Sequence, residues 1–281
     1  GGGSQTIPEL TVELISTYND QTASFSTSYG SFMRNFIVHT PPNFDYQTES
    51  LPLLFVLHGY TGRAPSIREY SGFDQIADEE RFIVVYVQGT TDQFGNTGWN
   101  VNVVASFLGV DDVGFFKALI KYFKASYNID SNKIFSSGMS LGGFMSYRLA
   151  CELEEINSIG SVTGSMAGYY QCNPPKKSSI IHLHGMNDAI VPYNGVEWSF
   201  SAKAAHDFWK NHNQCNSQNE ITIPDFNGDG EYTTRLISYD CEDNKSVELY
   251  SLEGEGHTWW KKSWGHDINT SELIWQFFKS Q

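Results

Sequence analysis

Two short runs of the chain constrain its fold most, because they are apolar at consecutive positions. They are "LPLLFVLHG" (51–59) and "FIVVYVQG" (82–89), and each is closed by a glycine. A strand with apolar side chains on both of its faces is typical of a parallel sheet that helices cover on both sides. These two runs therefore predict the centre of such a sheet.

Strands and helices are expected to alternate along the rest of the chain. Apolar patterns predict strands at 34–40, 133–138, 158–164, 179–185, 233–239 and 246–252, and helices at 73–80, from Asp112 onward, at 144–153, 198–212 and 271–279. This alternation predicts an α/β fold with a mostly parallel central sheet and helices on both faces. We found no linker or repeat, so we expect residues 5–281 to form one domain. Residues 1–4 (GGGS) resemble an expression scar or linker.

The charge of the chain limits its partners. The net charge is −14 over 281 residues, which disfavours nucleic acid and anionic membranes because like charges repel at long range. No run of 18 apolar residues predicts a transmembrane helix, and no signal peptide is present in the sequence. We therefore expect no nucleic-acid or membrane partner and a neutral substrate.

The four cysteines are widely spaced. Cys151, Cys172, Cys215 and Cys241 form no C-x-x-C pair, which argues against a zinc site and against a redox motif. Two disulfides are allowed, in three connectivities. Pairing of neighbours, 151–172 and 215–241, closes the shortest loops, while four free buried thiols in a cytosolic protein remain the alternative.

A serine lies between two glycines where a predicted strand meets a predicted helix. The segment reads Gly138-Met139-Ser140-Leu141-Gly142. In such a strand–turn–helix unit, a tight turn strains the central residue and lifts its side chain clear of the sheet, at the positive end of the next helix. The pattern predicts that Ser140 is a nucleophile, whereas an idle serine in a glycine-rich turn is the plain alternative.

A serine nucleophile needs a base and an acid that orients it, which follow in the order Ser, Asp or Glu, His in this fold class. Asp188 lies in the loop after the strand 179–185, and His257 lies in the glycine-rich loop after the strand 246–252. We therefore predict Ser140, Asp188 and His257 as a catalytic triad. His266 is the one serious rival for the role of base.

The oxyanion of an acyl-transfer intermediate needs two N–H donors. The residue after the nucleophile, Leu141, supplies one. The loop after the strand 51–59 is expected to supply the other, and we assign it to the N–H of Tyr60. His58, at the end of the same strand, is a candidate for contact with the substrate.

Seven segments, in this order, resemble the polyhydroxybutyrate depolymerase-like esterases, which are close kin of bacterial feruloyl and acetylxylan esterases. They are "LPLLFVLHGYTG", "GTTDQFGNTGWN", "VDDVGFFKALI", "GMSLGGFMSYRLAC", "HGMNDAIVPY", "GEGHTWW" and "IWQFF". The resemblance covers about residues 29–279. It implies an α/β-hydrolase fold, ester hydrolysis and the same three triad residues.

The resemblance also implies an extracellular or periplasmic setting, with a Cys215–Cys241 disulfide that braces the histidine loop. One departure stands out. The family motif reads Gly-His-Thr-Trp-Pro-Gly, but here His257 is followed by Thr258-Trp259-Trp260-Lys261. The leaving-group side of the site is therefore expected to differ from that of the relatives.

Two tryptophans and one acidic loop carry weaker signals. Trp99 and Trp259 lie in loops expected to face the site, where they would stack on an aromatic acid or a sugar, although core packing is the alternative. The segment 225–231 (DFNGDGE) resembles the start of a calcium loop but has Leu236 where such a loop needs glutamate, so a hairpin turn is favoured. We expect no metal.

The sequence predicts a serine carboxylic ester hydrolase that needs no cofactor. Its substrates are expected to be feruloyl or acetyl esters of plant polysaccharide, or related aryl or short-chain esters. A polyhydroxybutyrate depolymerase is the alternative within the same chemistry. A catalytically silent carbohydrate-binding protein is the alternative from another class. We expect a secreted or periplasmic monomer.

Overall fold

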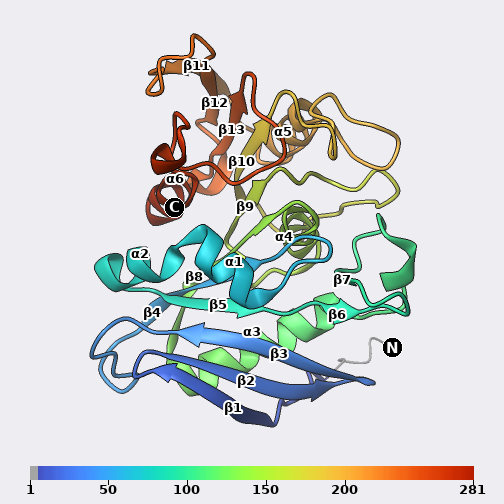
Figure 1. The fold of residues 1–281 in the computed structure, drawn as a ribbon, viewed down its shortest axis with the longest axis vertical. Helices are drawn as coiled ribbons and strands as arrows, with labels where there is room; N and C mark the ends of the chain where they lie inside the picture. The colour runs from blue at the N-terminus through green and yellow to red at the C-terminus, as the bar shows by residue number, and fades with distance from the viewer. Residues whose placement is uncertain (1–5) are drawn as a thin grey trace.

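An eleven-stranded sheet runs through the whole protein (Figure 1). The structure is a computed structural model that describes residues 6–281, so the predicted scar at 1–4 lies outside the described residues. The strand order is β1-β2-β3-β5-β4-β8-β9-β10-β13-β12-β11. The N-terminal strands form one edge of the sheet and the C-terminal hairpin forms the other, as the colours in Figure 1 show.

The centre of the sheet is parallel, as its apolar runs predict. Its strands are β5 (Ile83–Val87), β4 (Leu51–Leu57), β8 (Ile129–Met139), β9 (Ser158–Val162), β10 (Ser179–Gly185) and β13 (Val247–Leu252), each parallel to its neighbours within this group. In a parallel sheet the carboxyl ends of all the strands point to the same side of the molecule. Loops after these strands therefore gather on one side of the molecule.

The two edges of the sheet are antiparallel. On one side, β1 (Val12–Asn19), β2 (Thr22–Tyr29) and β3 (Phe32–His39) form a meander that joins β5. On the other side, β12 (Thr233–Tyr239) pairs with β13, and β11 (Ser217–Ile223) pairs with β12. The loop 225–231 joins this last hairpin. There the Asp225 carboxylate accepts hydrogen bonds from the N–H groups of Gly228 and Gly230, as a turn requires.

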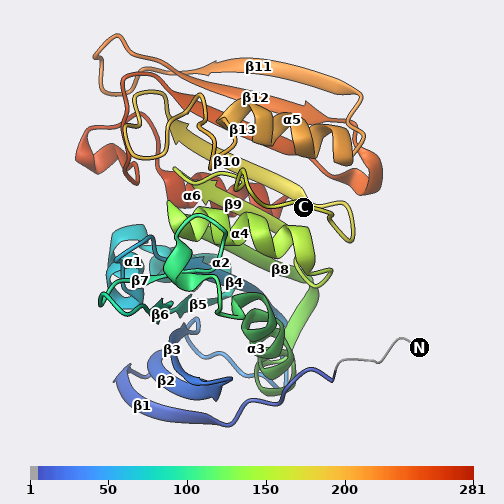
Figure 2. The same ribbon diagram turned by 90° about the vertical axis from the view of Figure 1, so that its right-hand side faces the viewer.

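Helices cover both faces of the sheet (Figure 2). On one face lie α1 (Ala64–Ser71), α2 (Phe73–Glu80) and α6 (Thr270–Lys279); on the other lie α3 (Asp112–Tyr127), α4 (Leu141–Glu152) and α5 (Ala202–His212). The short elements are β6 (Thr90–Thr91), β7 (Thr97–Gly98), and the 3-10 turns η1 (Ala105–Phe107), η2 (Glu242–Asn244) and η3 (Lys262–Trp264).

Alternate residues of each central strand feed two separate cores. In β4, Phe55 packs edge-on against Phe116 of α3, with 5.4 Å between ring centroids, while its neighbours Leu54 and Val56 join the core on the opposite face. On that opposite face Phe135 stacks on Phe278 of α6 at 4.6 Å. Burial on both sides explains why the runs carry no polar alternation.

Several elements differ from the sequence prediction, among them the edge strand β11, whose mostly exposed sequence "SQNEITI" was not expected to be a strand. The strands β1 and β2 were not expected, because their sequences "VELISTYN" and "TASFSTSY" are largely polar and β1 is mostly exposed. The helix α1 was also missed. The helix expected from 198 begins at Ala202, where the Ser201 hydroxyl caps it by accepting a hydrogen bond from Ala204 N–H. Within residues 6–281, no helix has the length and apolar character needed to cross a membrane.

Candidate active site

Ser140 occupies the sharp turn between β8 and α4 in a strained conformation, with φ of 54° and ψ of −119°. Positive φ is costly for a residue with a side chain, so the surroundings must hold it. The turn leaves no room for side chains at the two flanking glycines. A Cβ at Gly138 would lie 2.4 Å from Gly142 backbone atoms, and one at Gly142 would lie 2.3 Å from Leu57 O. The spacing of these glycines follows from this packing.

Asp188 and His257 meet at the carboxyl ends of two neighbouring strands. The loop after β10 carries Asp188, and the loop after β13 carries His257; because the two strands are adjacent and parallel, their loops are neighbours. His257 Nδ1 donates a 2.8 Å hydrogen bond to Asp188 Oδ2. The second carboxylate oxygen, Oδ1, accepts from the N–H groups of Ile190 and Val191, each at 2.9 Å.

The Asp188 carboxyl has no solvent exposure in its side chain. Burial alone would raise its pKa, but hydrogen bonds from His184, His257 and Val191 N–H outweigh burial and hold the pKa well below the usual range. Asp188 therefore stays ionised at neutral pH. His257 uses its Nδ1–H in the bond to Asp188. A neutral His257 ring therefore keeps Nε2 free to accept a proton.

A cleft of about 320 Å³ brings Ser140 and His257 together. Its walls come from the loop after β4, from α1 and from the β8–α4 turn, and the residues are His58, Gly59, Tyr60, Thr61, Gly62, Arg63, Ser66, Ile67, Tyr70, Met139, Ser140 and His257. No hydrogen bond joins Ser140 to His257 within residues 6–281. In enzymes such contacts often tighten only when substrate binds.

Two backbone donors beside Ser140 have no acceptor among the described residues: the N–H groups of Tyr60 and Leu141. Leu141 is the first residue of α4, where N–H groups lack partners within the helix. Gly59 lets the Tyr60 loop approach, since a Cβ there would lie 3.3 Å from Ser140 Cβ. The two N–H groups belong to the loop after β4 and to the first residue of α4, and their role as oxyanion donors stays a prediction.

Several proteins of known kind are similar to this chain in sequence. No protein-family model matches. A bifunctional acetylxylan esterase/xylanase of Neocallimastix patriciarum is 25% identical, covering 80% of this chain and 31% of that protein, so this chain spans about a third of that relative's length. Feruloyl esterase D of Neurospora crassa is 24% identical, covering 92% of this chain and 86% of that protein.

Among solved structures, an acetyl xylan esterase from Aspergillus awamori superposes with a TM-score of 0.60 at 14% identity, covering 96% of this chain and all of that one. At such identity the superposition establishes the fold. The chain has the α/β-hydrolase fold and is a distant relative of feruloyl and acetylxylan esterases. The predicted fold and the predicted kinship with feruloyl and acetylxylan esterases are thereby confirmed, whereas the resemblance to polyhydroxybutyrate depolymerases stays a prediction.

The two tryptophans of this chain do not face the cleft, which corrects the expectation that they stack on a substrate. Trp99 and Trp259 are both fully buried. Trp99 Nε1 donates to the His58 carbonyl oxygen at 2.8 Å, and Trp259 Nε1 donates to Ser271 Oγ at 3.0 Å. Large rings with one polar atom fill the core well where that atom finds a partner. Core packing, the alternative weighed for both, is what the structure contains.

His58 lines the cleft but has no free ring nitrogen for a substrate, so a polar substrate contact by its ring is also corrected. Its Nδ1–H donates to Gly59 O at 2.7 Å, and its Nε2 accepts from Gly89 N–H at 2.9 Å. Burial lowers the pKa of His58 to about 4, against the opposing effect of the Gly59 hydrogen bond. The ring is neutral at pH 7 and links the Tyr60 loop to Gly89, in the segment that follows β5.

Both neighbour-paired disulfides are present, Cys151–Cys172 and Cys215–Cys241. The second one does not brace the histidine loop. Because β12 is antiparallel to β13, Cys241 follows the end of β12 that pairs with Val247, whereas His257 follows the opposite end of β13. A strand of this length separates the two by roughly 20 Å.

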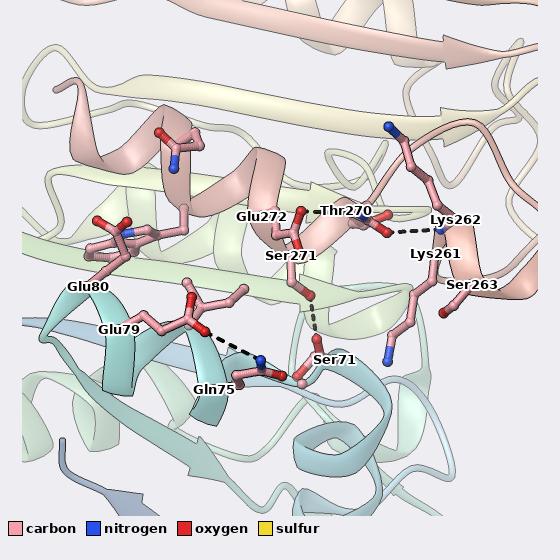
Figure 3. A pocket seen from close by; sticks show the side chains of 15 residues that line it. Ser71, Gln75, Glu79, Glu80, Lys261, Lys262, Ser263, Thr270, Ser271 and Glu272 are labelled. Carbon is pink, nitrogen blue, oxygen red and sulfur yellow. Dashed lines mark hydrogen bonds between the residues drawn. The ribbon is translucent and has the colours of Figure 1, made fainter. Parts of the chain in front are cut away.

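A cavity of about 590 Å³ lies apart from the predicted triad, none of whose residues line it (Figure 3). It is formed by α2, α6 and the segment from Lys261 to Ser263, with Glu79 and Glu272 among its walls. His266, the rival candidate for the base, is not among the residues that line the cleft that holds Ser140. Its Nδ1 pairs with Glu255 Oε1 at 2.7 Å.

Sequence reasoning missed the wall of the cleft that α1 provides. Tyr70 reaches the histidine loop, where its hydroxyl contacts Thr258 Oγ1 at 2.9 Å and accepts from Trp259 N–H at 3.1 Å. Arg63 and Ile67 line the same wall. The signal that could have found α1 is Pro65, since proline is favoured in the first turn of a helix.

Proposed function

We propose that this chain is a serine carboxylic ester hydrolase that acts by two-step acyl transfer. One observation carries the proposal: a strained Ser140 shares a cleft with His257, whose other ring nitrogen is held by Asp188 at 2.8 Å. Each group lies in the loop where this chemistry requires it. Esterase names among the relatives support the same reaction.

In the first step His257 Nε2 takes the hydroxyl proton of Ser140 while Oγ attacks the ester carbonyl carbon. The carbonyl oxygen gains the negative charge, and the N–H groups of Tyr60 and Leu141 bind it. His257 then passes the proton to the leaving alcohol as the C–O bond breaks, which leaves an acyl group on Ser140. Asp188 stays ionised and stabilises the charged imidazole.

In the second step water attacks the acyl group and His257 takes its proton. The tetrahedral intermediate uses the same two N–H donors. Its collapse releases the carboxylic acid, and the proton returns to Ser140 Oγ. The sum is one ester and one water converted to one acid and one alcohol, so the reaction needs no cofactor.

The substrate class that we propose is a feruloyl or acetyl ester of plant polysaccharide, or a related aryl or short-chain ester. The side chains around Ser140 include Tyr60, Ile67 and Tyr70, which offer apolar and aromatic contact to an acyl group. The relatives' names point to the same esters. Two disulfides fit an oxidising compartment, so we also propose a secreted or periplasmic monomer built as one domain.

A substrate panel tests this proposal. Methyl ferulate, acetylated xylan and a polyhydroxybutyrate suspension are incubated separately with the protein, and the Ser140→Ala variant serves as the blank. Ferulate or acetate release that depends on Ser140 supports the proposal. Release of hydroxybutyrate alone would replace the substrate class with polyester, and release of nothing from any ester would favour a silent binding protein.

A further inference from the structure

A chain of buried hydrogen bonds runs through the core and ends at the triad's carboxylate. His182 and His184 lie two residues apart on β10, so both point to the face covered by α4 and α5. Both are fully buried, as is Tyr147 of α4 at 1% exposure. The mechanism above uses none of the three.

The contacts in this series of hydrogen bonds are short and follow one another without a gap. Tyr147 Oη lies 2.8 Å from His182 Nδ1, and His182 Nε2 lies 2.9 Å from His184 Nδ1. His184 Nε2 then lies 2.8 Å from the Val191 carbonyl oxygen. A carbonyl oxygen only accepts, so His184 must carry its hydrogen on Nε2.

That one assignment fixes all the others when both rings are neutral. His184 Nδ1 then accepts from His182 Nε2–H, and His182 Nδ1 accepts from the Tyr147 hydroxyl. Burial, with repulsion from His184 and His206 added, holds the pKa of His182 well below its usual range, which agrees with a neutral ring. Each nitrogen of the two rings then has a partner, and all the hydrogen bonds are donated in the direction from Tyr147 to Val191.

His184 meets the Asp188 loop at two points. Its Nε2–H binds the carbonyl of Val191, the same residue whose N–H binds Asp188 Oδ1. The same Nε2 also lies 3.4 Å from Asp188 Oδ2, the oxygen that holds His257. The histidine therefore clamps the loop and places a second positive hydrogen beside the carboxylate.

We propose that His184 is a positioning residue for the Asp188 carboxylate, through the Nε2–H that it directs at the Val191 carbonyl oxygen and at Asp188 Oδ2. This inference rests on the proposed function. Without the Nε2–H, more negative charge stays on the oxygen that faces His257. The protonated His257 ring is then stabilised, and it keeps its proton to higher pH.

Few titratable groups surround the buried hydrogen bonds of His182 and His184. His182 shares β10, Tyr147 comes from α4, and His206 faces His182 from α5. Tyr193 lies against His184, with 6.0 Å between ring centroids, and its hydroxyl is paired with Ser251. Glu255 is turned toward His266, so Asp188 and His257 are the charged partners that matter.

Three variants separate positioning from plain structural support. His184→Met removes the donor, and His184→Gln offers an amide N–H near the same place. Both leave His182 Nε2–H without its acceptor, so they share that defect. Tyr147→Phe removes a hydrogen bond from the same chain but far from Asp188, which makes it the control for general loosening.

The measurement is the pH dependence of kcat and KM on methyl ferulate, or on the best ester of the panel. We expect His184→Met to lower kcat by roughly 10- to 100-fold with little change in KM. Its acidic limb of kcat/KM should move to higher pH by roughly half to one unit. His184→Gln should recover most of both changes, and Tyr147→Phe should lower the melting temperature without moving the limb.

The proposal is overturned if His184→Met keeps the parental kcat and limb, or if Tyr147→Phe moves the limb as far. An NMR titration of the His257 ring in the parent and in His184→Met gives a second readout that needs no turnover. If the parent hydrolyses no ester, the proposed function fails; the NMR midpoint then decides the role of His184 alone, with an upward shift supporting it and no shift refuting it.

Discussion

Trp99 Nε1 donates a 2.8 Å hydrogen bond to the carbonyl oxygen of His58, and the two rings lie with centroids 5.1 Å apart. This contact joins the buried loop after β7 to the loop that presents the Tyr60 N–H. Trp99 thus supports the loop of the proposed oxyanion donor from the core side, where its ring is fully buried.

Replacing Trp99 with Phe should therefore change kcat more than KM. The ring volume is largely kept, but the buried His58 carbonyl loses its donor, which costs roughly 1–3 kcal/mol of unfolding free energy. Steady-state kinetics and chemical denaturation together check this prediction. A variant with a raised KM and unchanged kcat would instead support stacking of Trp99 on the substrate.

Substituting Gly59 should impair catalysis while leaving the fold. An added Cβ would lie 3.3 Å from Ser140 Cβ and 3.3 Å from Met139 O, so it would crowd the nucleophile. We expect Gly59→Ala to lower kcat by roughly 2- to 10-fold, since the atoms beside the nucleophile must shift by a few tenths of an ångström. Gly109→Ala is the matched control because a Cβ there meets nothing within 4 Å. Equal kinetics in the two variants would contradict the crowding.

The ionised Asp188 should make stability depend on acid pH. Because its pKa is lower in the folded protein than the ordinary value of about 3.9, its contribution is fully present above that value and is lost as pH falls toward the folded pKa. Asp188→Asn removes this dependence. Unfolding free energies measured from pH 6 downward should thus fall more steeply for the parent than for the variant below about pH 4.

The same Asp188→Asn variant should lose roughly 10⁴-fold in kcat at pH 7, because an amide favours the wrong tautomer of His257. A variant whose stability curve runs parallel to that of the parent, or whose kcat is unchanged, would show that Asp188 is not the triad's acid.

The Cys215–Cys241 disulfide should matter for stability and little for catalysis. The bond closes a separation of 26 residues, for which chain-entropy arguments give roughly 3–4 kcal/mol, and it lies at the edge of the sheet opposite His257. Double replacement by alanine should lower the unfolding free energy by that amount and leave kcat/KM within about twofold. A large loss of kcat in a folded variant would restore the idea of a brace on the histidine loop.

An element could be predicted from the sequence where the pattern that specifies it lies within the element itself. The central strands could be predicted because Leu51–Leu57 and Ile83–Val87 are apolar at every buried position. The turn at Ser140 could be predicted because its glycines are required by the packing of that turn alone. Strands β1 and β2 could not, because their largely polar sequences pair at an exposed edge and leave no clear apolar pattern.

The direction of a side chain was the hardest property to infer. Trp99 and Trp259 lie in loops near the cleft, and nothing in their local sequence distinguishes a ring that faces substrate from one that faces the core. His182 and His184 could be placed on a strand, but their hydrogen bonds depend on Tyr147 and Val191, which are distant in sequence or on another element. Such partners emerge only from the tertiary structure.

The central claim is that Ser140 is an activated nucleophile, and covalent labelling tests it most directly. The protein is treated with a fluorophosphonate at neutral pH, and the adduct is counted and located by intact-protein and peptide mass spectrometry, with Ser140→Ala in parallel. The account predicts one adduct per chain, on Ser140, which is absent from the variant. An unlabelled parent protein, or a label that persists in Ser140→Ala, would contradict it.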